Sequence, residues 1–405
     1  MRFDKPFTQQ EPIGEETIAR VADVLRTGRL HRYNTVPGET APASALEAAF
    51  AAAQGARYCL ATTSGGTALA IALRAVGVRP GDTVLANAFT LAPVPGAMHS
   101  VGARVALVEI DAGWHIDMDH LAARQAETGA RVLMLSHMRG HIADMDAVTA
   151  FCEARGVTLI EDCAHTMGAT WDGRPSGSFG RVACFSTQTY KHVNSGEGGL
   201  LTTDDEEVAA RAIVMSGSYM LYASHGAAPD EAVFRRLRLD QPNLSSRIDN
   251  VRALIALDQL ASLPDRVKRW NALWSVLAAG LRESAAIHLP SRDLREGFVG
   301  SSIQFRPQLA PSALPDLVAA CAARGVDVKW FGAHEPVAFT SRFDSWTYLG
   351  EAPDLPATRA VLSRTCDMRV PLTFDEIDCR TIATIVTEEV ERLAARHGAP
   401  ERAAA

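Results

Sequence analysis

A single lysine near the middle of the chain stands in a setting suited to covalent chemistry. Lys191 lies in FSTQTYKHVNSGEGGLL (185–201), between a hydroxyl-rich strand end and a run of glycines. No Asp or Glu lies between Thr187 and Gly196 to neutralise it locally. An amine that acts as a nucleophile must be free of salt bridges and partly desolvated, so that it loses its proton easily. The pattern favours a lysine that bonds to a carbonyl group, with an exposed loop lysine as the alternative.

A glycine-rich turn and an acidic strand end supply two further groups. TSGGTAL (63–69) is a strand–turn–helix junction, where Gly65 and Gly66 let backbone N–H groups and a helix N-terminus approach an anion. A simple turn is the alternative, because such glycines are common. LIEDCAHTMGA (159–169) ends a buried strand at Asp162. This acid either caps the next turn or faces the ring nitrogen of a cofactor.

Together the three features form the minimum set for pyridoxal phosphate. They provide a phosphate cradle, an acid that keeps the ring nitrogen protonated and an amine that reacts with an aldehyde, in that order along the chain. Each follows a predicted strand, and open α/β sheets place their ligands at the carboxyl ends of strands.

The elements around these residues predict an α/β fold. Short runs of Val, Ile and Leu alternate with amphipathic helices, which indicates a mostly parallel sheet covered on both faces. Helices are predicted at 15–28, from about Gly66 and at 144–156. Strands are predicted at 57–63, 82–88, 104–110, 131–137, 157–162, 181–187 and 199–203.

The chain of 405 residues is longer than one core usually supports, and its texture changes from about residue 248. Residues 248–284 predict two long helices broken at Pro264. A smaller α+β unit is expected beyond them, with strands at 301–309 and 326–330 and helices at 312–325 and 375–398. We predict a large domain at 1–260, a small C-terminal domain at 261–398 and a frayed tail at 399–405.

Composition narrows the class of protein. Hydrophobic content of 47% and charged content of 21% are ordinary for a globular protein, and a net charge of −7 argues against a nucleic-acid surface. No apolar run approaches the ~20 residues needed to span a bilayer. Seven scattered cysteines without zinc spacing read as reduced thiols. We expect a cytoplasmic protein that binds neither nucleic acid nor membrane.

These residues resemble the DegT/StrS family of sugar aminotransferases, within fold type I of the pyridoxal-phosphate-dependent enzymes. The similarity runs nearly end to end, and its most specific block is 161–201. The matching segments are IGEETIARVADVLRTGRL (13–30), TSGGTALAIAL (63–73), GDTVLANAFT (81–90), the whole of 161–201, SRIDNVRALIALDQL (246–260) and VPLTFDEID (370–378).

The resemblance implies roles for individual residues. Lys191 would bond to the cofactor aldehyde and later move the substrate proton, and Asp162 would bind the pyridine nitrogen. The other cofactor-binding positions would be Gly65, Gly66, Thr67, Phe89, Ala164, His165 and Ser186. The family is dimeric with shared active sites, so Asn243 or Ser245 would reach the phosphate bound in the partner subunit.

The chain departs from the family pattern in three places. Leu91 stands where an aromatic residue often stacks on the ring, which leaves Phe89 or an aliphatic contact for that role. Ser245 stands where the family has Asn. The segment 28–39 differs from the short loop usual near the substrate.

By resemblance, the expected reaction is transfer of an amino group from glutamate or glutamine to a keto sugar, nucleotide-linked or free, or to a cyclitol. A relative with histidine in place of the lysine removes a hydroxyl, and Lys191 therefore favours transamination. The alternatives are transfer to a small keto acid or an aromatic or cyclitol precursor, and a cofactor-binding regulator without turnover. A Rossmann dehydrogenase is disfavoured because no G-x-G-x-x-G follows the first strand.

Several other polar residues are weaker candidates for the functional site. His137 and His141 lie in a strand-to-loop segment with a glycine between them, and the resemblance, which implies an active-site loop here, favours a substrate-side loop over a metal site. Arg139 and Arg32 are candidates to meet an anionic group. Three residues of 328–336 are either structural or part of a pocket wall: Lys329, Trp330 and His334.

Overall fold

The computed structural model describes residues 1–337 and 342–397 of the chain. The predicted tail at 399–405 lies outside the described residues. Within the described part, no helix is long and apolar enough to cross a membrane.

A central sheet of seven strands forms the core, in the order β1-β9-β8-β5-β4-β2-β3. β9 runs antiparallel to both β1 and β8, and the remaining neighbours are parallel, which confirms the predicted mostly parallel sheet. The strands are β1 (Tyr58–Thr62), β2 (Thr83–Asn87), β3 (Arg104–Val108), β4 (Val132–Ser136), β5 (Thr158–Asp162), β8 (Val182–Ser186) and β9 (Gly199–Thr203). All seven fall within the ranges expected from the sequence.

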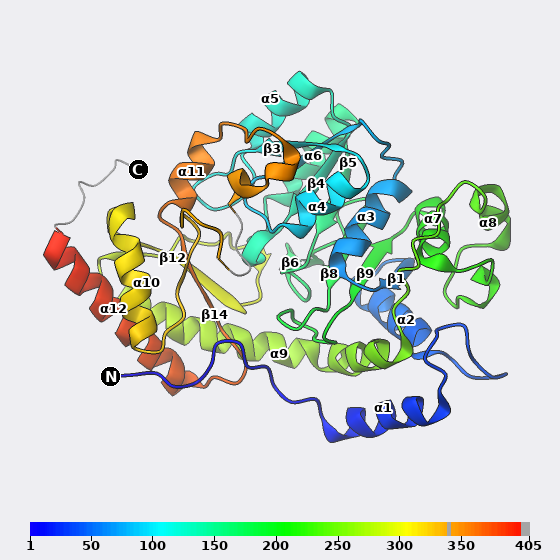
Figure 1. The fold of residues 1–405 in the computed structure, drawn as a ribbon, viewed down its shortest axis with the longest axis horizontal. Coiled ribbons are helices and arrows are strands. Elements are labelled where there is room, and N and C mark those ends of the chain that lie inside the picture. Colours follow the sequence, from blue (N-terminus) through cyan, green and yellow to red (C-terminus); the bar gives the residue numbers. More distant parts are fainter. Residues whose placement is uncertain (338–341, 398–405) are drawn as a thin grey trace.

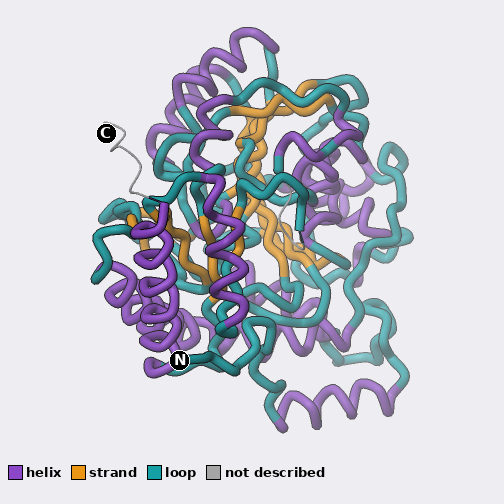
Figure 2. The backbone as a smooth tube through the Cα atoms, turned by 60° about the vertical axis from the view of Figure 1, so that its left-hand side comes forward, coloured by secondary structure: helices purple, strands orange, loops and turns teal. Residues whose placement is uncertain are grey.

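Helices cover both faces of this sheet, as Figure 2 shows for the strands lying between them. Side chains of β4 alternate between two cores: Leu133 and Leu135 join one, and Met134 joins the other. That alternation follows from the period of two in a strand and explains why the strand reads as continuously apolar. The helices of this part are α1 (Glu15–Thr27), α2 (Pro42–Gln54), α3 (Gly65–Ala75), α4 (Pro93–Ser100), α5 (Met118–Thr128), α6 (Met145–Arg155), α7 (Glu206–Gly217) and α8 (Glu231–Leu237).

One long helix, α9 (Asn250–Arg282), runs below the central sheet and on beneath the C-terminal unit (Figure 1). The prediction of two helices broken at Pro264 is wrong, because Pro264 lies inside this continuous helix. A proline there loses one helical hydrogen bond and crowds the preceding turn. Side chains on both sides of it, including Leu254 and Leu277, are buried, and the packing of α9 against α2 and α12 outweighs that cost. The predicted domain boundary near residue 260 falls within α9, and the division into domains stays a prediction.

The C-terminal unit contains a four-stranded sheet in the order β10-β12-β14-β13. Its strands are β10 (Ile287–His288), β12 (Ser302–Pro307), β13 (Lys329–Trp330) and β14 (Cys366–Arg369), and its helices are α10 (Leu314–Ala323), α11 (Pro356–Leu362) and α12 (Glu376–His397). A small sheet of β6 (Thr170–Trp171), β7 (Arg174–Pro175) and β11 (Glu296–Gly297) joins the two parts.

The first residues of the chain lie on the C-terminal unit. Phe3 and Phe7 make edge-to-face contacts with Phe374, with ring centroids 5.1 and 5.0 Å away. The Phe3 N–H donates to the carbonyl of Arg324 at 2.8 Å. This arrangement carries Thr8 to the wall of the main cavity.

Candidate active site

A cavity of about 740 Å³, called the main cavity below, lies where loops from both parts of the chain meet. The central sheet contributes the turn from β1 into α3, the end of β8 and the segments that follow β4 and β5. The C-terminal unit contributes residues around β13 and β14. The described residues of the wall are Thr8, Ser64, Gly65, Gly66, Leu91, Pro93, Arg139, His165, Ser186, Gln188, Tyr190, Lys191, Glu197, Asp327, Lys329, Val337 and Arg369.

Lys191 lies in this wall, partly buried, with its Nζ 2.8 Å from His165 Nε2. Burial, reinforced by the positive charges of Arg139 and Arg369 and opposed by Asp162, lowers the pKa of Lys191 to about 7. Burial and the neighbouring Lys191 hold the pKa of His165 well below its usual value. The imidazole is therefore neutral, and the amine loses its proton near neutral pH, as a nucleophilic lysine requires.

Asp162 is the last residue of β5 and is 7% exposed. Its Oδ2 accepts from Ser136 Oγ at 2.7 Å, and its Oδ1 accepts from the Ala164 N–H at 3.2 Å. Ser136 is itself held by Asn87, whose Oδ1 accepts from the Ser136 N–H at 2.9 Å. The side chain therefore caps the next turn and presents a fixed carboxylate at the strand end, and its contact with a ring nitrogen stays a prediction.

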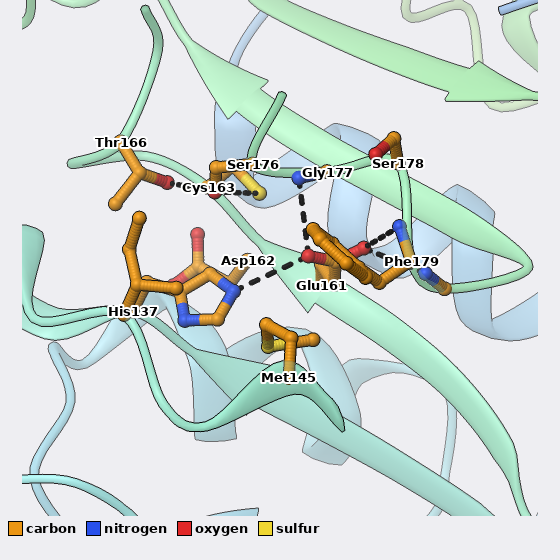
Figure 3. A network of polar contacts seen from close by, with 12 residues as sticks. His137, Met145, Glu161, Asp162, Cys163, Thr166, Ser176, Gly177, Ser178 and Phe179 are labelled. Carbon is orange, nitrogen blue, oxygen red and sulfur yellow. Dashed lines mark hydrogen bonds and ion pairs between the residues drawn. The ribbon is translucent and has the colours of Figure 1, made fainter. Parts of the chain in front are cut away.

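Glu161, the neighbour of Asp162, faces a different environment that the sequence did not reveal. Its carboxylate is fully buried and accepts from the N–H groups of Gly177, Phe179 and Gly180 at 3.0, 2.8 and 2.6 Å, and His137 Nε2 lies 3.3 Å away (Figure 3). These bonds fasten the turn at 177–180 to β5.

His137, Glu161 and Cys163 also have potential ligand atoms within 4.8 Å of one another. Both oxygens of Glu161 already accept from backbone N–H donors, three in all, which would compete with a cation for the carboxylate. The cluster therefore holds the strand end in position and does not suit a metal ion.

The turn from β1 into α3 forms an anion cradle. Ser64 caps α3, since its Oγ accepts from the Thr67 N–H at 3.1 Å, and the helix N-terminus points toward Ser186. A Cβ at Gly65 would lie 2.9 Å from the Cβ of Ser186, so only glycine allows this approach. The free N–H groups, the helix dipole and the Ser186 hydroxyl suit a phosphate.

These residues fit pyridoxal phosphate. The cradle matches the phosphate, the carboxylate of Asp162 matches a protonated ring nitrogen, and the low-pKa amine of Lys191 matches the aldehyde. Ala164 and His165 line a small cavity of about 30 Å³ that adjoins Lys191, which is where the resemblance places the face and edge of the ring.

Two predicted cofactor contacts have other surroundings. Among the described residues, Leu91 lines the cavity and Phe89 does not; Phe89 makes an edge-to-face contact with Phe331 at 5.0 Å. Thr67 is not part of the described cavity wall, and its Oγ1 lies 2.8 Å from Ser64 Oγ. Ser64, which was not predicted from the sequence, lies in the wall instead.

Asn243 lies outside the cavity wall formed by the described residues of its own chain. Its Oδ1 accepts from the Ser245 N–H at 2.9 Å, and Ser245 has a left-handed backbone with φ of 50°. A contact of Asn243 or Ser245 with a phosphate in a second subunit stays a prediction.

The weaker candidates divide into structural and cavity residues. Arg32 is fully buried and makes two 2.6 Å bonds to Glu47, so it is committed to the fold. His334 is exposed, and the Trp330 indole donates to the carbonyl of Ser363 at 2.9 Å. Lys329 and Arg139 do line the cavity.

Comparison with known proteins gives relatives that include aminotransferases. The chain is 32% identical over 282 residues to a putative L-glutamine:3-amino-2,3-dideoxy-scyllo-inosose aminotransferase of Micromonospora echinospora, which covers 69% of this chain and 64% of the relative. It is 32% identical over 223 residues to the GDP-perosamine synthase of Caulobacter vibrioides, covering 55% and 57%. These matches span less than two thirds of the relatives' own lengths.

Solved structures share the whole fold. The crystal structure of 3-amino-5-hydroxybenzoic acid synthase has a TM-score of 0.80 at 26% identity and covers 96% of this chain and 99% of its own. The aminotransferase TlmJ of Streptoalloteichus hindustanus has a TM-score of 0.82 at 22% identity, covering 95% and 99%. The architecture is therefore that of the fold type I aminotransferases.

The family follows from a match along most of the chain. Residues 11–387 fit the sequence model of the DegT/DnrJ/EryC1/StrS aminotransferases, and this range contains the cradle, Asp162 and Lys191. The chain belongs to the DegT/DnrJ/EryC1/StrS aminotransferase family, whose cofactor is pyridoxal phosphate.

Proposed function

We propose that the protein is a pyridoxal-phosphate-dependent aminotransferase that moves an amino group from glutamate or glutamine to a keto sugar, nucleotide-linked or free, or to a cyclitol. The observation that carries this proposal is Lys191, whose pKa is lowered to about 7 beside a neutral His165 in the main cavity. The names of two relatives support the substrate class. One is a putative aminotransferase for 3-amino-2,3-dideoxy-scyllo-inosose, and the other is a GDP-perosamine synthase.

The residues that would hold the cofactor come from three strand ends. Ser64, Gly65, Gly66 and Ser186 would bind its phosphate, Asp162 its ring nitrogen, and Lys191 its aldehyde carbon. When bound, pyridoxal phosphate supplies a ring that accepts the electrons of the substrate carbon.

The chain's own residues supply the proton transfers. Lys191 Nζ, which loses its proton readily because its pKa is lowered to about 7, would take the proton from the substrate carbon and return it during transfer. His165 Nε2, 2.8 Å away, orients that amine and takes no charge itself. Asp162, fixed by Ser136 and the Ala164 N–H, keeps its negative charge in one place during the reaction.

The visible absorption spectrum of the purified protein tests this proposal. We expect the band of a lysine-bound cofactor, its conversion by excess glutamate or glutamine, and its absence in Lys191→Ala. Lys268→Ala is the matched control, because Lys268 is an exposed lysine paired only with Asp265 on α9 among the described residues. A band that no amino donor changes would exclude transamination, and the absence of any band with added cofactor would exclude the role of Lys191.

We further propose a homodimer with shared active sites in a reducing compartment such as the cytoplasm. Asn243 and Ser245 lie outside the described wall of the cavity in their own chain, and Tyr219 and Met220, on the same connection between α7 and α9, are 60% and 48% exposed. All seven cysteines are buried and free, as expected in a reducing compartment.

Mixing the inactive variants Lys191→Ala and Asn243→Ala should restore activity through hybrid dimers that keep one intact site. Mixtures that remain inactive, although each variant is dimeric by sedimentation, would contradict sharing.

A further inference from the structure

Lys191 lies near the tip of a loop whose base is fastened by its own hydrogen bonds. We call residues 187–198, which connect β8 to β9, the lysine loop. At its base the Thr187 N–H donates to the carbonyl of Gly198 at 2.9 Å. The tip at 190–194 also has contacts with α9 and with the C-terminal unit, and these contacts decide where the amine of Lys191 lies.

Helix α9 holds one side of the tip. The Asn194 N–H donates to Gln259 Oε1 at 2.9 Å, and Gln259 Nε2 donates back to the carbonyl of Asn194. Arg266 Nη1 donates to the same oxygen of Gln259 at 2.9 Å. Gln259 and Arg266 both belong to α9, so this side of the lysine loop is fixed to the helix.

His192, the residue after Lys191, contacts the C-terminal unit. Its Nε2 lies 2.9 Å from Oγ of Ser301, which directly precedes β12. His192 is only 2% exposed, and burial, with the positive charge of Lys191, lowers its pKa to about 3. The ring is therefore neutral near pH 7, and it acts through its hydrogen bond and its shape and not through proton transfer.

The bond between His192 and Ser301 is part of a closed ring of contacts. The Val370 N–H donates to the carbonyl of Ser301 at 2.9 Å, and the Trp270 indole donates to the carbonyl of Val370 at 3.0 Å. The Trp270 ring meets His192 edge to face, with centroids 5.2 Å apart. All four residues line the small cavity that adjoins Lys191. The ring of contacts thus joins the lysine loop to α9 and to the C-terminal sheet.

Ser301 has a firm support of its own. The Gly300 N–H donates to Asn271 Oδ1 at 2.7 Å. A Cβ at Gly300 would lie 2.5 Å from the Cβ of Trp274, so this segment packs against α9 as closely as glycine allows. The Ser301 hydroxyl is therefore a fixed point, from which His192 takes its position.

We propose that His192 and Ser301 are positioning residues, which hold the amine of Lys191 in place beside His165 for the transfer reaction. Lys191 and His192 share a planar peptide unit, so fixing the ring of one restrains the backbone of the other. An amine that takes and returns a proton must stay within hydrogen-bond reach of its target. The inference deepens the proposed function, because it concerns the residue that would bond to the cofactor.

The surroundings of Lys191 make its pKa a measure of its position. The charged and titratable groups around it are Asp162, His165, His192, Arg139 and Arg369. Burial is the largest cause of the lowered pKa of Lys191, and the two arginines add to it, whereas Asp162 opposes it. A lysine loop released from Ser301 would be more hydrated, so this pKa should rise toward its ordinary value.

Competitive labelling of the full-length, cofactor-free protein with acetic anhydride measures this pKa. Mass spectrometry follows acetylation of Lys191 against pH, with the exposed Lys268 as internal standard. In Ser301→Ala and in His192→Leu the midpoint should rise by about half a pH unit or more, because a buried hydrogen bond is lost. His192→Gln, whose amide can reach the same hydroxyl, should recover part of the shift.

The double variant His192→Leu with Ser301→Ala tests whether the two residues act together. Because both single changes remove the same bond, the double variant should shift no further than the larger single one. His225→Leu is the matched control, since His225 is similarly buried and its Nδ1 lies 2.9 Å from the hydroxyl of Tyr33, outside both described cavity walls. Its midpoint should equal that of the wild type.

Three outcomes would overturn the proposal: an unchanged midpoint in Ser301→Ala, shifts that add in the double variant, or an equal shift in His225→Leu. Ser301→Ala removes a single oxygen atom, so the test stands on it where a change at His192 prevents folding. The proposed function is judged separately, by the spectral change of the cofactor-loaded wild type with glutamate or glutamine. Failure of one therefore does not decide the other.

Discussion

Single residues decide the chemistry of this cavity, and their properties come from contacts that are distant in sequence. Lys191 loses its proton easily because it is buried near Arg139 and Arg369, which precede and follow it by 52 and 178 positions respectively in the numbering of the chain. Sequence reasoning identified Lys191 and Asp162 because each follows a recognisable strand. It passed over Ser64 and Arg369, since neither has a local pattern that distinguishes it from an ordinary cap or strand residue.

The pKa of Lys191 predicts how the cofactor-free protein combines with pyridoxal phosphate. Only the unprotonated amine reacts, and with a pKa of about 7 its fraction rises about tenfold per pH unit below 7 and levels off above 8. The second-order rate of appearance of the visible band should follow this curve. In Arg369→Gln the midpoint should move to higher pH, because a positive charge that lowers the pKa is removed. An unchanged midpoint would show that the charge of Arg369 does not contribute to the lowered pKa of Lys191.

Adding a single methyl group at Gly65 should lower the affinity of the protein for its cofactor. Gly65→Ala would place a Cβ 2.9 Å from the Cβ of Ser186 and push the cradle open, so affinity for pyridoxal phosphate should fall by about tenfold or more. Gly66→Ala is the comparison, since its nearest atom would be 3.7 Å away, an ordinary contact, and its loss should be smaller. Fluorescence titration of the two variants measures the difference. Equal losses would locate the phosphate elsewhere.

At the scale of elements, burial explains what the sequence could and could not predict. Parallel strands covered on both faces must be apolar along their length. The sequence therefore predicts β2, β4, β5 and β8 from their runs of Val, Ile and Leu. That α9 is continuous could not be predicted from the sequence, because the cost of Pro264 is local. The packing that outweighs this cost comes from α2 and α12. The fastening of the 177–180 turn by Glu161 was hidden for the same reason.

Pro264 predicts a stabilising substitution. Pro264→Ala restores a helical N–H donor and removes ring crowding in α9, so the free energy of unfolding should rise by about 1–3 kcal/mol in urea titrations. Activity should stay the same, because Pro264 lies outside the described cavity wall. A fall in stability would show that the packing of α9 on α2 and α12 requires the proline.

At the scale of the whole molecule, a buried ion pair joins segments that are far apart in the chain. The guanidinium of Arg32 makes two 2.6 Å bonds to Glu47 of α2 and donates to the carbonyl of His225 at 3.2 Å. Glu47 also accepts from the Ala61 N–H of β1 at 2.8 Å. The segment 28–39, which departs from the family pattern, is thus tied to the central sheet and to the connection that follows α7.

Removing the negative charge of Glu47 should therefore cause a large loss of stability. Glu47→Gln leaves Arg32 buried without a counter-charge and should lower the free energy of unfolding by about 3–5 kcal/mol. Glu39→Gln breaks the more exposed pair with Arg29 in the same segment and should cost less than about 1 kcal/mol. Urea unfolding of the cofactor-free proteins compares them. Similar losses in both variants would mean that the buried pair contributes no more than the exposed one.

The seating of the N-terminal segment on the C-terminal unit has a consequence for biosynthesis. Phe3 and Phe7 rest on Phe374, and Thr8 reaches the cavity wall. During translation these residues are synthesised more than three hundred residues before the surface on which they dock. The central sheet can begin to form during translation, but the cavity receives its last wall only after synthesis has passed residue 374. The apoprotein that first meets pyridoxal phosphate in its complete site is therefore a chain that already contains Phe374.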